Sequence, residues 1–407
     1  MVISTAVYYA LSDIYTKGSW INEAIKHYLP GFMMEPKYYR LVHTVVERDF
    51  IAEYRISRLT ERPPKTSVKI ILKIGMALLD VFDIPEYAVV NDVTEMTKAL
   101  GKSGVSGFVN AVLRRYAREA REWYPEDPVE NLAARANRPL WQVRRYIKEL
   151  GMEEASRRLL TVKTENTHIR PLRSFGREAL RKELDDMGCF YEETEYGFYI
   201  NGECKWHGLY LEAKATAMSW SSIDVCESVP YEGGMILDLC AAPGGKSIYF
   251  ADKYGARVVS CDKYIHRVKL INEYIFATKT KGISTIISDA RYPIPEWKDK
   301  FPVVFLDAPC SGFGSLATNQ DVVLHRTEKD VEEIIKLQKE LISVACEYVA
   351  DGGVLVYATC SDLPSEDEEI VRSLLDKRGD FSMEKEKHTD PAKGGGESYY
   401  CAVLRKK

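Results

Sequence analysis

The sequence predicts a doubly wound α/β domain, preceded by an all-helical region and a small α+β region. The clearest sign is the stretch Met235–Lys246, M-I-L-D-L-C-A-A-P-G-G-K, where a short strand runs into a turn of small residues and helix-permissive sequence follows. From about residue 230 onward, runs typical of strands alternate with runs typical of helices. That alternation predicts a largely parallel sheet covered by helices on both faces.

Composition is that of a soluble globular protein, with 407 residues, 45% hydrophobic and 29% charged. This length suffices for two or three domains. The amino-terminal residues lack a basic start, and Asp13 and Lys17 interrupt their apolar run, so no signal peptide is predicted. No run reaches the roughly 18 apolar residues of a membrane span. We therefore expect a cytoplasmic protein without a membrane segment, and we expect a monomer.

The earlier part of the chain divides by changes in pattern. Residues 1–124 show apolar residues at helical spacing, broken by prolines and glycines, and are predicted to be helical throughout. Tyr124–Pro128 predicts a linker, and 130–160 predicts two short basic helices. Residues 167–204 combine short β-like runs with a helix near 176–187, which predicts a small α+β insert. The domains predicted from these changes are residues 1–124, 125–205 and 206–407.

Six strands are predicted in the last domain, near 235–239, 256–261, 283–288, 302–306, 353–358 and 399–404. Ser365 and Glu368 are read as a capping box for a helix over 366–377. The acidic run Glu366–Glu369 is therefore interpreted as a helix start and not as a metal site.

Nine cysteines are scattered without a C-x-x-C pair or a His/Cys cluster. This pattern predicts neither a zinc site nor a disulfide framework. Cysteines at the ends of apolar runs suit a reducing compartment. No metal is expected in this protein.

Charge is distributed unevenly along the chain. Residues 1–175 hold 27 Lys+Arg against 21 Asp+Glu, and the remainder holds 29 against 39. A basic half joined to an acidic half suggests a module that binds a polyanion such as RNA. Trp141 and Tyr146 lie among basic residues, as in proteins that stack on unpaired bases, although a place in a helical core is favoured for both. The arginines that could meet phosphates on the last helix of the first region are Arg114, Arg115, Arg118 and Arg121.

The turn that follows the first predicted strand is expected to bind a nucleoside cofactor. Strand, glycine turn and helix present backbone N–H groups at the carboxyl edge of a doubly wound sheet. Gly244 and Gly245 allow the main chain to approach a ligand closely. Asp262 ends the next apolar run, 18 residues beyond Gly244, where a carboxylate can accept ribose hydroxyls.

Two loops at the carboxyl ends of strands carry a cysteine each, Phe305–Gly314 with Cys310 and Val356–Ser361 with Cys360. Such loops share the rim of the sheet that holds the glycine turn. A thiolate is a strong nucleophile at neutral pH. Beside a nucleoside cofactor it suits methylation at C5 of a pyrimidine, because C5 becomes nucleophilic only after an addition to C6.

Three motifs in order, Asp238–Lys246, Asp307–Cys310 and Thr359–Ser361, resemble those of the Nop2/NSUN/RsmB family of S-adenosylmethionine-dependent RNA 5-methylcytosine methyltransferases. The resemblance implies that Cys360 attacks C6, that Cys310 assists release of the product, and that Asp307 binds N3 of cytosine. It also implies a cofactor site lined by Cys240, Ala241, Ala242, Pro243, Gly244, Gly245, Lys246, Asp262, Asp289 and Asp307.

The runs Asp83–Val93 and Gly107–Arg115 resemble the NusB family of all-helical RNA-binding domains, which points to the RsmB branch and to ribosomal RNA as the substrate. Ala317–Asp321 departs from the family, which has two basic residues and a Pro-Asp pair after the first cysteine. Leu211–Lys214 and Pro171–Phe175 also depart. These departures affect the identity of the substrate more than the chemistry.

Three alternatives stay open. A transfer RNA could carry the target cytosine. A DNA cytosine methyltransferase also uses a Pro-Cys loop, although the presence of both cysteine loops argues against that class. A non-catalytic RNA-binding assembly factor would fit the helical region and the basic half of the chain.

Overall fold

The computed structural model describes residues 5–29, 36–161, 166–202, 204–316 and 319–407. The chain forms two compact units. The first comprises Met1–Leu160 with Gln320–Arg326, and the second comprises Thr161–Asn319 with Thr327–Lys407. The boundary between the units at Leu160–Thr161 differs from the domain limits predicted at 124 and 205, and those limits stay predictions.

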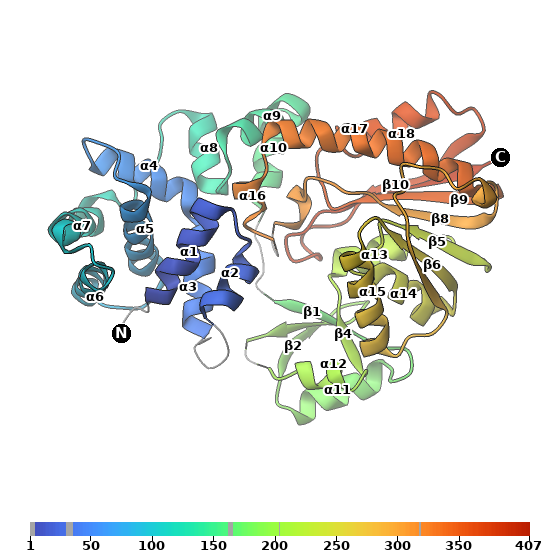
Figure 1. Cartoon of the computed structure of the whole chain (residues 1–407), viewed down its shortest axis with the longest axis horizontal. Helices are drawn as coiled ribbons and strands as arrows, with labels where there is room; N and C mark the ends of the chain where they lie inside the picture. The colour runs from blue at the N-terminus through green and yellow to red at the C-terminus, as the bar shows by residue number, and fades with distance from the viewer. Residues whose placement is uncertain (1–4, 30–35, 162–165, 203, 317–318) are drawn as a thin grey trace. The chain divides into compact units, whose positions relative to one another are not determined.

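The first unit is helical, as predicted for residues 1–124. Its core is built from the apolar faces of the helices. A π-helical turn, Tyr116–Ala120, extends α7. The helices, labelled in Figure 1, are α1 (Thr5–Lys17), α2 (Ile21–Tyr28), α3 (Pro36–Glu47), α4 (Asp49–Leu59), α5 (Thr66–Val81), α6 (Glu86–Ala99), α7 (Ser103–Arg115), α8 (Pro128–Ala136), α9 (Leu140–Leu150), α10 (Met152–Leu159) and α16 (Val322–His325).

Much of the positive charge of this unit is used internally. Arg138 and Arg145 are buried, and Arg145 pairs with Glu149 at 2.8 Å. Arg121 turns inward and donates to the carbonyl oxygen of Leu79. Of the two aromatic residues favoured for the core, Tyr146 is fully buried. Arg114, Arg115 and Arg118 stay exposed on α7 and its extension.

Two buried ion clusters brace the helices of the first unit. Arg55, 2% exposed, donates to Asp80 at 3.2 Å and to the Tyr116 hydroxyl at 2.8 Å. Tyr116 in turn donates to Asp80 at 2.6 Å. In the second cluster, Lys73 and Asp49 lie 2.5 Å apart. Each buried charge thus has a partner of opposite sign, which offsets the cost of removing it from water.

The segment 320–326 lies in this unit although it follows the Cys310 loop in sequence. Asp321 accepts a hydrogen bond of 2.7 Å from the backbone N–H of Ile21, the first residue of α2. The rings of Trp20 and His325 are 4.4 Å apart. Asp321 therefore caps the start of α2. Ala317 and Thr318 lie outside the described residues.

The second unit begins with a small sheet in the order β2-β3-β1-β4, all antiparallel. The predicted helix is present as α11, and α12 follows the sheet's third strand in sequence. These elements are β1 (Thr167–Pro171), α11 (Arg177–Asp186), β2 (Phe190–Glu193), β3 (Phe198–Asn201), α12 (His207–Leu211) and β4 (Ala215–Ala217).

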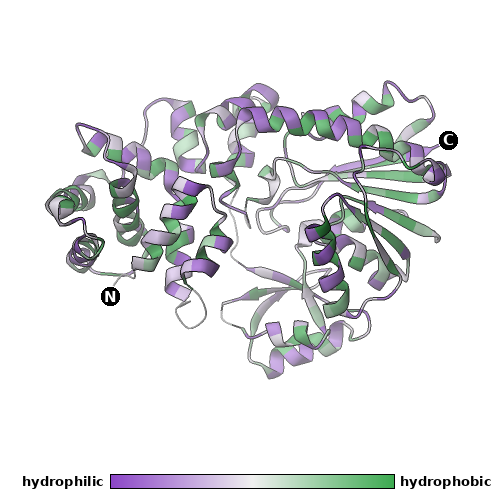
Figure 2. Cartoon of the chain, viewed as in Figure 1, coloured by the Kyte–Doolittle hydropathy of each residue, from purple (hydrophilic) through white to green (hydrophobic). Residues whose placement is uncertain are grey.

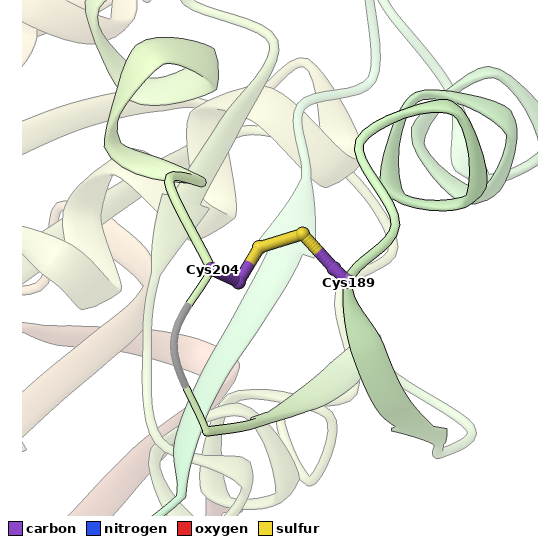
Figure 3. Close-up of a disulfide and its surroundings, with 2 residues drawn as sticks. All are labelled: Cys189 and Cys204. Carbon is purple, nitrogen blue, oxygen red and sulfur yellow. A yellow bond between two sulfur atoms is a disulfide. The ribbon is translucent and has the colours of Figure 1, made fainter.

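A disulfide joins Cys189 to Cys204 in this small sheet region (Figure 3). The prediction of no disulfide framework was wrong on this point. Fifteen residues separate the two cysteines, and the hairpin of β2 and β3 brings their ends together. Spacing alone could not show this, because the pairing depends on the strand register.

The large sheet has the order β10-β11-β9-β8-β5-β6-β7. Its strands run in one direction except β11, which is antiparallel to both of its neighbours. The six predicted strands are present, and β10 was missed. The bounds are β5 (Met235–Leu239), β6 (Arg257–Asp262), β7 (Ile283–Ile287), β8 (Phe301–Asp307), β9 (Val349–Thr359), β10 (Phe381–His388) and β11 (Tyr400–Lys406).

Helices cover both faces of the large sheet, with α13, α14 and α15 on one side and α17 and α18 on the other (Figure 1). The strands alternate with helices as a doubly wound α/β fold requires, and Figure 2 shows the strands of the sheet as largely hydrophobic. Ile223 of α13, Phe250 of α14 and Phe305 of β8 belong to one buried apolar cluster, in which the rings of Phe250 and Phe305 are 5.1 Å apart. The fold class predicted from the sequence is confirmed. The helices are α13 (Trp220–Cys226), α14 (Gly245–Tyr254), α15 (Ile265–Thr278), α17 (Glu328–Ala345) and α18 (Glu368–Leu375).

The predicted helix over 366–377 starts later than expected. α18 begins at Glu368, and no side chain caps its first N–H groups. Glu366 is instead fully buried, and its carboxylate accepts hydrogen bonds from elsewhere in the unit. The helix start predicted at 366 was therefore wrong, because Glu366 takes part in tertiary contacts. Asp367, and not Ser365, is the N-cap residue of α18, so the predicted capping box does not stand at the helix start.

Across the residues that the structure describes, none of the helices has the length and apolar character needed to cross a membrane.

Candidate functional site

Strands β5 and β8 are neighbours at the point where the chain order of the sheet reverses. In doubly wound sheets, ligands bind in the crevice outside the carboxyl ends of the strands at this point. Asp307 ends β8 and pairs in register with Ala358 of β9. The glycine turn and the two cysteine loops therefore leave the sheet along one rim.

The glycine turn folds tightly against the end of β6. Ala241 donates its backbone N–H to the carbonyl oxygen of Cys261 at 2.8 Å. Gly244 has φ of 108°, and a Cβ there would lie 3.1 Å from Ile271. Cys240 also has positive φ, at 61°, which is uncommon for a residue with a side chain. The turn thus keeps backbone next to the rim and excludes side-chain bulk at Gly244.

Asp238, one residue before the end of β5, is fully buried. Ser247 donates to one of its carboxylate oxygens, while the other has no hydrogen-bond partner among the described residues. Burial raises the pKa of this carboxyl to about 7. An orphaned acceptor beside the glycine turn fits a ligand that carries N–H or O–H groups, as an S-adenosylmethionine molecule does.

Asp262 and Asp289, both predicted to line the cofactor site, lie at the same edge of the sheet, because Asp262 ends β6 and Asp289 follows the neighbouring parallel strand β7. Asp262 is 2% exposed and accepts from the backbone N–H groups of Ala242 and Tyr264, each at 3.3 Å. Asp289 lies beyond β7 and pairs with Arg291 at 2.6 Å. That pairing holds the pKa of Asp289 well below its usual range.

The two cysteine loops bring their sulfur atoms together. The Sγ atoms of Cys310 and Cys360 are 2.8 Å apart, and both side chains are partly exposed. Gly314 of the first loop donates its N–H to the carbonyl oxygen of Cys360 at 3.0 Å. A Cβ on Gly314 would meet the carbonyl oxygen of Ser398 at 1.9 Å. Glycine is therefore required at position 314, where the backbone of Ser398 and that of Cys360 both come close.

Lys246 connects the glycine turn to the cysteine loops. Its ammonium donates to Asp307 at 2.6 Å and is close enough to Cys360 to interact with it electrostatically. Burial disfavours the charged amine, but Asp307 outweighs that effect and raises the pKa of Lys246 above its ordinary value. A positive charge is thus held beside the two sulfur atoms.

Cys310 and Tyr399 are both held in their protonated forms. Contact with Cys360 and burial raise the pKa of the Cys310 thiol well above its ordinary value. Burial, together with Glu397 and Cys360, raises the pKa of Tyr399 in the same way. Tyr399 was considered only as part of the last strand in the sequence, and its place near Cys360 depends on β11 pairing with β9.

Glu366 is the other site residue that sequence reasoning missed. It accepts from residues that directly follow each cysteine, Ser311 and Ser361. The acidic run around it gave a helix signal, so nothing local indicated a tertiary role.

Asp367, Glu368 and His388 place one possible metal-ligand atom each within 4.8 Å of one another. His388 and Glu368 already contact each other, with 2.9 Å between Nε2 and Oε1. The expectation that the protein needs no metal stays a prediction.

The fold and this rim define an S-adenosylmethionine-dependent methyltransferase. Residues 228–403 match the family described as 16S rRNA methyltransferase RsmB/F, and residues 6–118 match the NusB family. The chain is thus similar to RsmB/F methyltransferases over its second unit and to the NusB family over its helical residues.

Curated relatives span most of the chain. It is 29% identical to the protein of Bacillus subtilis named "Probable ribosomal RNA small subunit methyltransferase B", over 85% of this chain and 81% of that protein. Identity to the ribosomal RNA small subunit methyltransferase B of Pasteurella multocida is 27%, over 87% of this chain and 84% of the relative.

Solved structures share the fold. PH0851 aligns over 100% of both chains with a TM-score of 0.78 and 20% identity. NSun6 from Pyrococcus horikoshii, solved with the S-adenosylmethionine analogue SFG, covers 65% of this chain and 97% of its own, with a TM-score of 0.55 and 19% identity.

Proposed function

We propose that this protein is an RNA (cytosine-5)-methyltransferase in which Cys360 is the nucleophile and Cys310 releases the product. The observation that carries the proposal is the 2.8 Å contact between the two sulfur atoms, on the rim that holds the cofactor turn. Methylation at C5 of a pyrimidine needs a nucleophile at C6 and, later, a base at C5. Two cysteines on adjacent loops supply both.

The rim residues fit the first half of this reaction. Lys246 lies beside Cys360, whose sulfur adds to C6 as the thiolate and makes C5 nucleophilic. Asp307, which Lys246 holds in place, can accept a hydrogen bond from protonated N3 and so draw electrons from C6. S-adenosylmethionine, when bound, supplies the methyl group.

The protonation of Cys310 fits the second half. While Cys360 is free, its contact with Cys310 keeps the Cys310 proton in place. Bonding of Cys360 to C6 turns its sulfur into a thioether and removes that cause. Cys310 then loses its proton more readily and can take the proton from C5, directly or through one water. Loss of that proton expels Cys360 and completes the product.

The test uses Cys360→Ala and Cys310→Ala with radiolabelled cofactor and RNA. Cys360→Ala should give neither methylated product nor covalent adduct. Cys310→Ala should accumulate a protein–RNA complex that survives denaturing electrophoresis and carries the methyl group. Cys346→Ala, at a buried cysteine of the same unit, is the matched control and should behave as wild type.

The reverse pattern, with adduct trapped by Cys360→Ala, would exchange the roles and move the protein towards the DNA-type mechanism. Wild-type protein that binds RNA but transfers no methyl group would favour an assembly factor.

The substrate proposed is ribosomal RNA, because the matching family and both relatives quoted above are named for it. A stacked, paired cytosine hides C6 from a thiolate, and unstacking costs a few kcal/mol. The target is therefore expected in a loop or in partly assembled RNA. Bisulfite mapping of RNA from cells with and without the gene should reveal one lost 5-methylcytosine in ribosomal RNA. A loss in transfer RNA would identify the alternative substrate.

The first unit is proposed to bind RNA through the exposed arginines Arg114 and Arg118. The double variant Arg114→Glu/Arg118→Glu should bind RNA at least tenfold more weakly, with a shallower dependence on salt because fewer phosphates are neutralised. Cofactor affinity should not change. Lys17→Glu, at an exposed side chain of α1, is the control. Equal RNA affinity in wild type and the double variant would contradict this placement.

A further inference from the structure

The two cysteine loops are not held together by the sheet alone. Asp307 and Ala358 are the last paired residues of β8 and β9, so Cys310 and Cys360 both lie beyond the ladder. Flexible loops would let the sulfur atoms separate, and a pair that acts in sequence on one base needs a fixed spacing. Something other than strand pairing has to set that spacing.

Glu366 contacts both loops at once. Its Oε2 accepts a hydrogen bond of 2.7 Å from the backbone N–H of Ser311, next to Cys310. Its Oε1 accepts one of 2.9 Å from the hydroxyl of Ser361, next to Cys360. The side chain is fully buried, so water does not compete for these oxygens.

Gln338 of α17 also contacts Glu366 and the Cys310 loop. Its Nε2 donates to Glu366 Oε2 at 3.2 Å and to the carbonyl oxygen of Pro309 at 2.9 Å. Cys310 is therefore held on both sides, through Pro309 and through Ser311. The backbone of Glu366 is itself fixed, because the Tyr357 hydroxyl of β9 donates to its carbonyl oxygen at 2.8 Å.

The groups that face the Glu366 carboxylate are donors: a backbone N–H, a hydroxyl and a side-chain amide. A fully buried carboxylate without a cation is costly and is tolerated only where its hydrogen bonds are satisfied. A neutral residue of similar size could fill the space more cheaply. The arrangement thus indicates a role that depends on the acceptor geometry.

We propose that Glu366 is a positioning residue that fixes the distance between the Cys310 and Cys360 sulfur atoms by binding both of their loops. Because its side chain is fully buried, it acts through the two loops. Gln338 acts with it on the Cys310 loop. The kinetic part of this inference rests on the proposed roles of the two cysteines, whereas the spacing itself does not.

The first measurement reports the sulfur spacing without any methyl transfer. Diamide takes two hydrogens from a pair of nearby thiols, which become a disulfide while its azo group is reduced to a hydrazine. The rate at which the Cys310–Cys360 disulfide forms, followed by mass spectrometry of the linked peptides, therefore reports how well the sulfurs are juxtaposed. In the full-length protein, Glu366→Ala should slow this rate at least tenfold.

The second measurement is steady-state methylation. Glu366→Ala should lower kcat about 100-fold, the effect of losing two charge-assisted hydrogen bonds. KM for RNA and the affinity for S-adenosylmethionine should change less than twofold. A general loss of folding would alter all of these together.

Glu366→Gln separates geometry from charge. Its amide oxygen can still accept from Ser311, and its NH₂ can donate to the Ser361 hydroxyl, so both loops stay bound. This variant should recover most of the cross-linking rate and of kcat. Glu366→Asp, one carbon shorter, reaches only one loop and should resemble Glu366→Ala.

Cross-linking at the wild-type rate in Glu366→Ala would overturn the proposal. If Glu366→Ala does not fold, Ser361→Ala and Gln338→Ala take its place, and each should slow cross-linking about threefold to tenfold. Wild-type rates in both would also overturn it. If the variants slow cross-linking but the wild-type protein transfers no methyl group, the positioning role of Glu366 would stand and the proposed function would be rejected.

Discussion

The two units treat buried carboxylates in opposite ways. In the helical unit, Asp80 lies beside the guanidinium of Arg55, which is 2% exposed. In the methyltransferase unit, Asp238, Glu366 and Asp367 are fully buried, and the hydrogen bonds that hold them come from neutral donors. The buried charges of the first unit are thus paired with cations, whereas these three carboxylates of the second unit are held by neutral donors. Other acids of the same rim, Asp262, Asp289 and Asp307, do have cationic partners.

The difference separates a stabilising use of charge from a functional one. A carboxylate beside a cation is tied to that partner and braces the fold. A carboxylate held by hydroxyl and N–H groups keeps its charge at a high cost, and burial raises its pKa, as it does for Glu366 and Asp367. Such groups cluster where chemistry takes place.

The largest loss of stability is expected when the carboxylate that pairs with a buried cation is removed. Asp80→Ala would leave Arg55 buried without a counterion and should lower the free energy of unfolding of the helical unit by about 3–5 kcal/mol. Urea unfolding followed by circular dichroism would measure it. The exposed Asp83→Ala serves as the control, and an equal unfolding midpoint in both variants would remove the contrast between the units.

Asp238 tests the buried carboxylates of the second unit, which are held by neutral donors. Its pKa of about 7 in the folded protein exceeds the ordinary value of 3.8, so the native state holds an extra proton between these pH values. Stability therefore falls as pH rises from about 4 to 7, by up to about 4 kcal/mol. Asp238→Asn should abolish this part of the pH dependence. Parallel curves of unfolding free energy against pH for wild type and variant would contradict it.

The small sheet of the second unit relies on a covalent link instead of charge. Cys189→Ser opens a loop of 15 residues and should cost about 3 kcal/mol of stability in the absence of reductant. Wild-type protein treated with dithiothreitol should melt like the variant. A melting temperature unaffected by either treatment would show that this disulfide does not support the sheet.

A smaller effect is expected at the helix cap supplied from a distant part of the sequence. Asp321→Ala removes the acceptor for the Ile21 N–H and should destabilise the start of α2 by about 1–2 kcal/mol. Hydrogen exchange at Ile21 should speed up about tenfold or more. Glu23→Ala, exposed in the same helical turn, should leave that exchange rate unchanged.

The sequence predicted what depends on local pattern and on strand direction. Cys310 and Cys360 could be expected together, because carboxyl ends of parallel strands share an edge. Glu366 could not, because its partners Ser311 and Ser361 define its role, and Ser311 lies 55 residues away. Its neighbouring acids carried a helix-start signal that tertiary burial overrode.

Other misses have the same origin. The Cys189–Cys204 disulfide follows from the pairing of a hairpin, and the contact between Ile21 and Asp321 spans 300 residues. Arg121 donates to the carbonyl oxygen of Leu79, a contact that its position near the end of the first region did not indicate. Composition and periodicity predict which face of a helix or strand is apolar. They do not predict which residue, distant in the sequence, will contact that face.

The segment Gln320–Arg326 has a consequence for how this protein can be divided. It belongs to the helical unit, yet the chain on either side of it, up to Asn319 and from Thr327, belongs to the other. No single cut in the chain can therefore release either unit whole. An excised methyltransferase fragment would expose Val322 and Val323, which are buried in the whole protein. The helical fragment would lack Asp321, which caps the start of α2. Gene fusions and deletions that separate the two units at a single point would therefore disrupt both.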